Sequence, residues 1–170
     1  MKSNSSRKQK QEKSAKPSII ANGVSIKKIL VPIDFSEPSK NALKYAVSFA
    51  KYFGASLTLV YVVEPAIYPA DFSFGQVALP DFERELRQRG KSELESLMET
   101  HVIGQVTASA KVCTGKPFLE IINTAREEHS DLILIASHGH TGVEHLLFGS
   151  TAEKVVRKAS CPVLVLRPQE

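Results

Sequence analysis

Short apolar runs along the chain alternate with segments in which apolar residues recur every three to four positions. The apolar runs are rich in β-branched residues, which predicts five strands. They span residues 27–34, 56–63, 105–112, 131–136 and 162–166. The segments between them have one apolar face, which predicts four helices. These helices span residues 36–53, 81–103, 117–129 and 151–159.

Residues that begin and end helices stand at the borders of these segments. Ser36 is predicted to cap the first helix, Pro38 suits its first turn, and Gly54 ends it. Residues 65–80 mix proline, glycine and aromatic residues without periodicity, which predicts a long surface loop over an open face. The run at 105–112 alternates apolar and polar residues, as expected of a strand near the sheet edge.

The alternation of strands and helices predicts an α/β fold with a parallel sheet covered on both faces. We expect a three-layer α/β/α architecture with a doubly wound, five-stranded sheet in the order 3-2-1-4-5. The winding of such a sheet reverses between its first and fourth strands, and ligands bind outside the carboxyl ends of these strands. Those ends are Asp34 and residues 137–139, so the predicted ligand site is the crevice between them.

A glycine-containing loop connects the fourth strand to the last helix. Its two ends comprise Ala136, Ser137, His138, Gly139 and His140, and then Gly149, Ser150 and Thr151. Glycines let the backbone approach an anion closely, and the first N–H groups of the helix are available to bind it. Alternatively, Gly139 and Gly149 only form turns, and Ser150 or Thr151 caps the helix. Because this loop and Asp34 converge on one crevice, we favour a phosphate-binding loop.

Two further residues at strand ends are candidates for ligand contacts. Asp34 can accept hydrogen bonds from a ribose or an adenine amine, or help to hold Mg²⁺. Alternatively, Asp34 caps the following helix together with Ser36. Val62 ends the second strand, where it offers backbone groups to an adenine edge while its side chain packs in the core.

Motifs of several enzyme classes are absent from the sequence. No G-x-x-x-x-G-K-[ST] motif exists, which excludes the P-loop NTPases, and no G-x-G-x-x-G follows the first strand, which disfavours a dehydrogenase-type dinucleotide fold. No G-x-S-x-G elbow marks a serine nucleophile. His138, His140 and His145 lack the spacing of metal ligands, so we predict no metal site there.

The formal net charge of +4 resides in the first residues of the chain. Residues 1–22 hold six basic residues against Glu12 and carry +5, so the remainder carries −1. We predict a disordered basic tail over residues 1–22, one folded domain over residues 23–170, and no nucleic-acid surface on that domain.

No run approaches the roughly 18 apolar residues of a membrane span. Cys113 and Cys161 lack ligand spacing and are expected to be buried, reduced thiols of a cytosolic protein.

Four motifs occur in a fixed order along the chain. They are VPIDFSEPSKNAL after the first strand, V-x-T-G-K-P before the third helix, SHG-x9-GST after the fourth strand, and CPVLVLRP at the end. Together they resemble the universal stress protein family over about residues 26–168, which implies a Rossmann-like, adenine nucleotide alpha hydrolase-like fold. The ATP-binding branch of that family carries G-x-x-G-x9-G-[S/T]. Gly139, Gly149 and Ser150 match this pattern, whereas Ala136 replaces its first glycine.

The resemblance implies a cytoplasmic stress-response protein that binds ATP, with or without Mg²⁺, or a related adenine nucleotide, as a regulatory or signalling module. The implied nucleotide-binding residues are Pro32, Asp34, Val62, Ala136, Ser137, Gly139, His140, Gly149, Ser150 and Thr151. The resemblance implies no catalytic residue, and it implies a homodimer through the last strand, residues 162–166. Two alternatives stay open: a structural dimer that binds no nucleotide, and a slow ATP-hydrolysing or adenylate-chemistry enzyme.

Overall fold

The computed structural model describes residues 25–64, 79–139 and 148–167. These residues form a five-stranded sheet in the order β3-β2-β1-β4-β5, and every adjacent pair is parallel. The prediction of a doubly wound α/β sheet in the order 3-2-1-4-5 is therefore confirmed. The predicted disordered tail (residues 1–22), most of the predicted loop (residues 65–80) and His140 lie outside the described residues.

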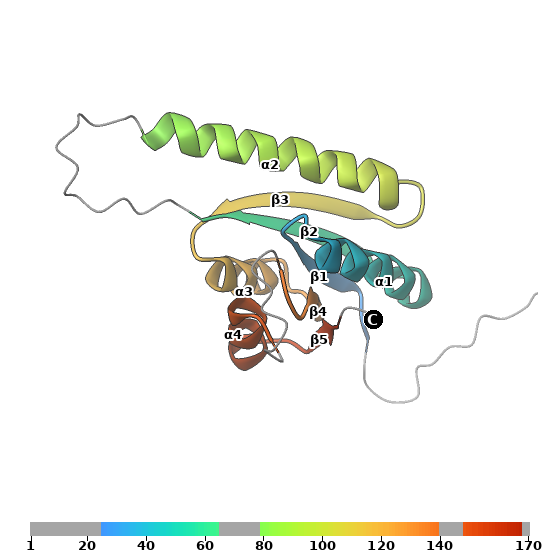
Figure 1. Cartoon of the computed structure of the whole chain (residues 1–170). Coiled ribbons are helices and arrows are strands. Elements are labelled where there is room, and N and C mark those ends of the chain that lie inside the picture. Colours follow the sequence, from blue (N-terminus) through green and yellow to red (C-terminus); the bar gives the residue numbers. More distant parts are fainter. Residues whose placement is uncertain (1–24, 65–78, 140–147, 168–170) are drawn as a thin grey trace, which may run out of the picture.

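Five strands and four helices alternate along the described chain (Figure 1). The strands are β1 (Lys28–Ile33), β2 (Ser56–Val63), β3 (Ala108–Thr114), β4 (Leu132–Ala136) and β5 (Val163–Leu166). The helices are α1 (Glu37–Phe53), α2 (Leu79–His101), α3 (Pro117–Glu127) and α4 (Ser150–Lys158). None of the helices in the described part of the chain combines the length and apolarity needed to cross a membrane.

Alternate residues of the central strands face opposite layers of helices. Val31 of β1 and Leu134 of β4 belong to an apolar cluster with α1 and α2, whereas Leu30 and Ile133 belong to a second cluster with α3 and α4. Figure 1 shows α3 and α4 beside each other, away from α1. Burial on both faces explains why β1 and β4 are near-continuous apolar runs in the sequence.

The third strand begins later than the sequence pattern predicts. We expected a strand over residues 105–112, but β3 starts at Ala108. The chain first turns after α2, where Gly104 has a φ of 79° and the N–H of Val106 donates to the carbonyl of Val102 at 3.4 Å. The alternating residues at the start of that run therefore belong to a turn. The strand itself lies at the sheet edge, as expected.

The predicted borders of α1 are confirmed. Ser36 is the N-cap, and its Oγ accepts a hydrogen bond from the N–H of Ser39 at 3.3 Å. Gly54 ends the helix in the left-handed region, with a φ of 67°, and its N–H donates to the carbonyl of Ala50. These caps fix where β1 leaves the sheet and where β2 begins.

A glycine inside α2 brings that helix close to β2. A Cβ at Gly90 would overlap the ring of Tyr61, whose Cζ would lie 3.5 Å away. The Tyr61 ring cannot easily yield, because it packs on Phe35 with a centroid distance of 4.8 Å. Gly90 therefore serves close packing rather than helix formation, for which alanine is the better residue.

We expect Gly90→Ala to lower the free energy of unfolding by about 1 kcal/mol. The cost of overpacking, about 1–3 kcal/mol, exceeds the gain in helix propensity of about 1 kcal/mol. In a Tyr61→Leu background, the same substitution should instead be neutral or stabilising. Urea denaturation of the four proteins measures both effects, and an equal loss in the two backgrounds would contradict the packing explanation.

Candidate functional site

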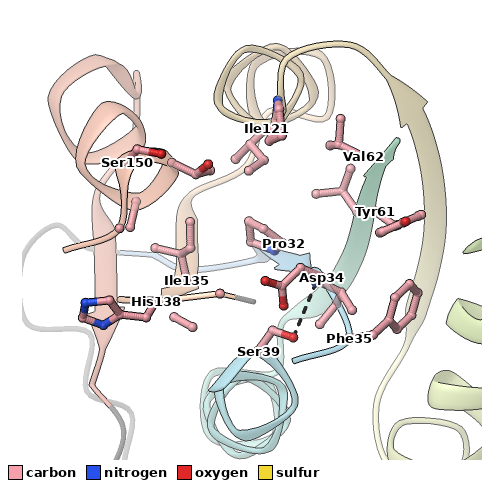
Figure 2. Close-up of a pocket in the computed structure, with 18 of the residues that line it drawn as sticks. Pro32, Asp34, Phe35, Ser39, Tyr61, Val62, Ile121, Ile135, His138 and Ser150 are labelled. Carbon is pink, nitrogen blue, oxygen red and sulfur yellow. Dashed lines mark hydrogen bonds between the residues drawn. The ribbon is translucent and has the colours of Figure 1, made fainter. Parts of the chain in front are cut away.

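A cavity of about 680 Å³ opens at the carboxyl ends of β1 and β4. This volume lies in the usual range for small-molecule sites. Nine of the ten sequence-predicted site residues line the cavity, and His140 lies outside the described residues. The nine are Pro32, Asp34, Val62, Ala136, Ser137, Gly139, Gly149, Ser150 and Thr151. Figure 2 shows Asp34 near the centre, with Ser150 and Tyr61 on opposite sides.

The Asp34 carboxylate stabilises the start of α1. Its Oδ1 accepts hydrogen bonds from the N–H of Ser36 at 3.0 Å and from the Ser36 hydroxyl at 2.5 Å. The backbone N–H of Asp34 in turn donates to Ser39 Oγ at 3.4 Å. One carboxylate oxygen of Asp34, Oδ1, therefore has the alternative role of stabilising the helix start together with Ser36. Asp34 also lines the cavity.

The two glycines of the loop after β4 lie close to neighbouring atoms. A Cβ at Gly139 would overlap Oδ2 of Asp34, and a Cβ at Gly149 would lie 3.3 Å from the carbonyl oxygen of Ser137. Neither glycine has the left-handed φ that would itself favour glycine. Close approach, rather than backbone conformation, is therefore what these two positions demand.

Ser137 holds the two ends of the loop together. Its N–H donates to the carbonyl of Leu166 in β5 at 2.7 Å, and its own carbonyl accepts from the N–H of Gly149 at 2.7 Å. Its Oγ lies 3.0 Å from Nδ1 of His138, and the residue is fully buried. These contacts give Ser137 a positioning role in the loop.

The N-terminus of α4 faces the cavity without a side-chain cap among the described residues. Its N-cap is Gly149, so the alternative in which Ser150 or Thr151 caps the helix is wrong. Ser150, Thr151 and Ala152 form the first turn and line the cavity. The first N–H groups of a helix have no partner within the helix and carry its positive dipole end. This turn is therefore suited to bind an anion.

The rest of the lining is mainly apolar and aromatic. Phe35 follows Asp34 with a φ of 64°, a left-handed conformation that costs a bulky residue about 1–3 kcal/mol. This turn lays its ring against Tyr61. Burial raises the pKa of the Tyr61 hydroxyl, and the carboxylates of Glu93 and Asp34 raise it further. The hydroxyl is therefore a neutral group at the cavity wall. Ile121 of α3 lines the opposite side (Figure 2).

The sequence patterns did not identify several of these residues. Glu93 and Ile121 lie on helices far from β1 in the sequence, and no local signal marks them. A signal did exist for Tyr61, because an isolated glycine inside a helix, Gly90, indicates a close neighbour. No signal in the sequence marked Phe35, because phenylalanine rarely adopts a left-handed backbone.

The backbone of Val62 is directed toward the cavity. The N–H of Ser56 donates toward β1, whereas the carbonyl of Val63 accepts from the β3 side. Alternation along a parallel strand therefore turns the backbone groups of Val62 toward β1. The pairing of β1 with β2 ends opposite Tyr61, so the carbonyl of Val62 lies just past it, at the cavity rim.

Ala136 remains in regular strand conformation. It pairs with Leu166 of β5, is buried, and packs with the α1 and α2 cluster. It does not have the left-handed φ that would make a glycine necessary. The replacement of the family pattern's first glycine therefore introduces no backbone strain here.

Metal ligands and reactive thiols do not form a second site in the described residues. No group of three or more His, Cys, Asp or Glu side chains there is arranged to hold a metal ion. Cys113 and Cys161 are both free and only partly buried. Burial, followed by the charge of Asp131, raises the pKa of the Cys161 thiol, which makes it less reactive.

Comparisons with known proteins agree with this architecture. A family model described as the universal stress protein family matches residues 25–167. Universal stress protein MJ0531 of Methanocaldococcus jannaschii is 34% identical over 154 residues, which cover 88% of either chain. Universal stress protein YxiE of Bacillus subtilis is 33% identical over 145 residues, or 82% of this chain and 98% of its own.

Solved structures show the same fold. The structure of hypothetical protein MJ0577 from M. jannaschii is 28% identical, with a TM-score of 0.75, and the match covers 86% of this chain and 99% of that one. A universal stress protein in complex with cAMP has a TM-score of 0.63 over 84% of this chain and 97% of its own, and one from Archaeoglobus fulgidus in complex with dAMP has 0.54 over 84% and 98%. Both are 19% identical to this chain.

We expect Ala136→Gly to lower the free energy of unfolding by about 0.5–1 kcal/mol, because glycine loses more backbone entropy on folding. If the cavity binds ATP, as the family resemblance implies, the affinity should change by no more than about twofold, since the methyl group packs in the core and strains no backbone. Chemical denaturation and calorimetric titration measure the two effects. A tenfold gain in affinity would mean that the alanine methyl obstructs the ligand.

Proposed function

The chain belongs to the universal stress protein family, and on that premise we propose that it binds ATP or a related adenine nucleotide as a regulatory module. One observation carries the proposal: the first turn of α4, without a side-chain cap among the described residues, faces the same cavity as Asp34 and Val62. One side of the cavity thus suits a phosphate and the other suits a flat, partly polar ring.

The phosphate end of the ligand binds at the start of α4. The N–H groups of Ser150 and Thr151 and their hydroxyls are the donors there. The adenine ring packs among the apolar side chains of Pro32, Val62 and Ile121. The carbonyl of Val62 accepts a hydrogen bond from the adenine amine, which gives the site its preference for adenine.

Two kinds of observation support this choice of ligand class. The cavity volume and its mainly apolar lining suit a nucleoside-sized molecule. Two universal stress proteins with the same fold were solved with cAMP and with dAMP, both of which are adenine nucleotides. These complexes concern those proteins, and they make adenine nucleotides the first ligands to test here.

Mg²⁺ fits the site as a companion of the phosphates. Mg²⁺ prefers one or two protein carboxylates together with phosphate oxygens and water. Asp34 beside Gly139 offers a carboxylate, and no described cluster holds three or more metal-binding side chains. The ion would therefore enter with ATP rather than reside in the protein.

A dedicated enzyme is the less favoured function. Ser137, whose Oγ lies 3.0 Å from Nδ1 of His138, has no solvent-exposed surface, so its hydroxyl is poorly placed to attack a bound nucleotide. ATP turnover faster than about one per second, typical of dedicated enzymes, would favour the enzyme instead. From membership of the family, we also propose that the protein is cytoplasmic and takes part in a stress response.

We expect calorimetry with ATP and Mg²⁺ to give micromolar affinity, or about 8 kcal/mol. Gly149→Val should abolish this binding, because the branched side chain would enter the loop where the Ser137 carbonyl already lies within 3.3 Å of a Cβ. Circular dichroism controls for folding.

Two outcomes would contradict the proposal. The absence of both heat and a thermal shift at millimolar nucleotide would exclude binding and leave the structural dimer as the better function. Unchanged affinity in a folded Gly149→Val protein would mean that the nucleotide binds elsewhere.

The homodimer is proposed to form through the open edge of β5. The carbonyls of Pro162 and Leu166 accept hydrogen bonds from the β4 side. Backbone groups alternate along a parallel strand, so those of Val163 and Val165 point to the open edge. An apolar edge strand with such groups is usually covered or paired, and pairing with a second copy satisfies them in a two-fold contact.

Val165→Pro should convert the dimer to a monomer in sedimentation experiments. Proline removes an N–H on the open side and leaves the hydrogen bonds to β4 intact. Val165→Thr keeps that N–H and should remain dimeric, and Val163→Pro is a second test should Val165→Pro fail to fold. A lysine at this position would be a poorer test, because Val165 packs against the α3 and α4 cluster. A folded proline variant that stays dimeric would place the contact on another surface.

A further inference from the structure

The side chains that line the cavity carry negative charge, although the cavity is proposed to bind phosphate. Its described lining includes the carboxylates of Asp34, Glu64 and Glu93, and no lysine or arginine. The two segments that follow the lining residues Glu64 and Gly139 also contain no lysine or arginine in the sequence. Among the described lining residues, only His138 can gain a positive charge, and its Nδ1 lies 3.0 Å from Ser137 Oγ.

Within the described lining, helix dipoles are the main compensation for a bound anion. A helix N-terminus is equivalent to about half a positive charge. The start of α4 lines the cavity, and so does Pro117 at the start of α3. The start of α1 is already neutralised, because Asp34 accepts hydrogen bonds from Ser36. The two helix starts together supply about +1, which offsets about half the charge of one phosphate, about −2, and a much smaller part of the charge of three.

From these charges, and resting on the proposed function, we propose that the site selects adenine nucleotides by the charge of their phosphate groups. A nucleotide with a single phosphate binds without a metal ion. ATP binds well only as its Mg²⁺ complex, in which the ion offsets the extra charge next to Asp34.

Glu64 and Glu93 are the residues that determine this selectivity. Both are exposed at the cavity, Glu64 directly after β2 and Glu93 on α2. The carboxylate of Glu93 acts on the neighbouring Tyr61, whose pKa it raises. Within the described residues, neither carboxylate forms an ion pair. Glu64 and Glu93 therefore repel each extra phosphate charge, whereas the charge of Asp34 is partly offset by its hydrogen bonds from Ser36.

Calorimetry on the full chain tests the proposal with AMP and ATP, each in EDTA and in Mg²⁺. In EDTA, AMP should bind at least about tenfold more tightly than ATP. Each like charge at the cavity weakens ATP binding by on the order of a few tenths of a kcal/mol to 1 kcal/mol, and several such charges act together. Mg²⁺ should strengthen ATP binding and leave AMP binding nearly unchanged. Equal affinity of ATP and AMP in EDTA would overturn the selectivity, while the proposed nucleotide-binding function would stand. If neither nucleotide binds in either buffer, the proposed function itself fails, and the selectivity fails with it.

Two variants locate the effect. Glu64→Gln and Glu93→Gln should each strengthen ATP binding in EDTA by about two- to fivefold and change AMP binding less. Glu99→Gln is the matched control, because Glu99 is exposed on α2, roughly 9 Å along the helix from Glu93, and does not line the cavity. An effect of Glu99→Gln as large as that of Glu93→Gln, or no effect of either cavity variant, would overturn the assignment of selectivity to these carboxylates.

Discussion

The pairing of β1 with β4 is the contact on which the rest of the molecule depends. The two strands lie side by side, with Leu30 opposite Ile133, yet the helices that follow them cover opposite faces of the sheet. The Asp131 carboxylate secures the start of this pairing by accepting the N–H groups of Lys27 at 2.7 Å and Lys28 at 2.9 Å. Because the chain leaves the two strands in opposite directions, nothing in the winding fills the space beyond their carboxyl ends. The cavity is therefore a consequence of the strand order rather than an addition to it.

The two helix starts at this cavity differ in how their N–H groups are used. The start of α1 is closed by protein groups, because Ser36 caps it and Asp34 binds Ser36. The start of α4 has a glycine cap, Gly149, and no side-chain partner among the described residues. A single carboxylate thus completes one helix and borders the space in front of the other, where Gly139 touches it. This division leaves the cavity one side that is suited to an anion, despite its acidic lining.

Local signals in the sequence were enough to predict the fold and most of the residues that line the candidate site. Apolar runs and caps such as Ser36 and Gly54 located the elements, and the alternation of strands and helices determined the sheet order. The site residues at strand ends followed from that order. The residues that were missed depend on contacts between distant elements: Tyr61 faces α2, and Glu93 reaches the cavity from that helix. The left-handed backbone of Phe35 was beyond local patterns too, since it depends on packing against Tyr61 and the adjoining apolar cluster.

Ser137 links the candidate phosphate-binding loop to the edge strand β5, since it forms hydrogen bonds with both Gly149 and Leu166. Thermodynamic linkage makes any coupling between the two reciprocal. If an occupied loop changes how tightly the β5 edges of two copies associate, then association changes the affinity of the loop by the same factor. A tenfold change corresponds to about 1.4 kcal/mol, which is the scale of one hydrogen bond. The abundance of the protein in the cell would then act as an effector of its own ligand affinity.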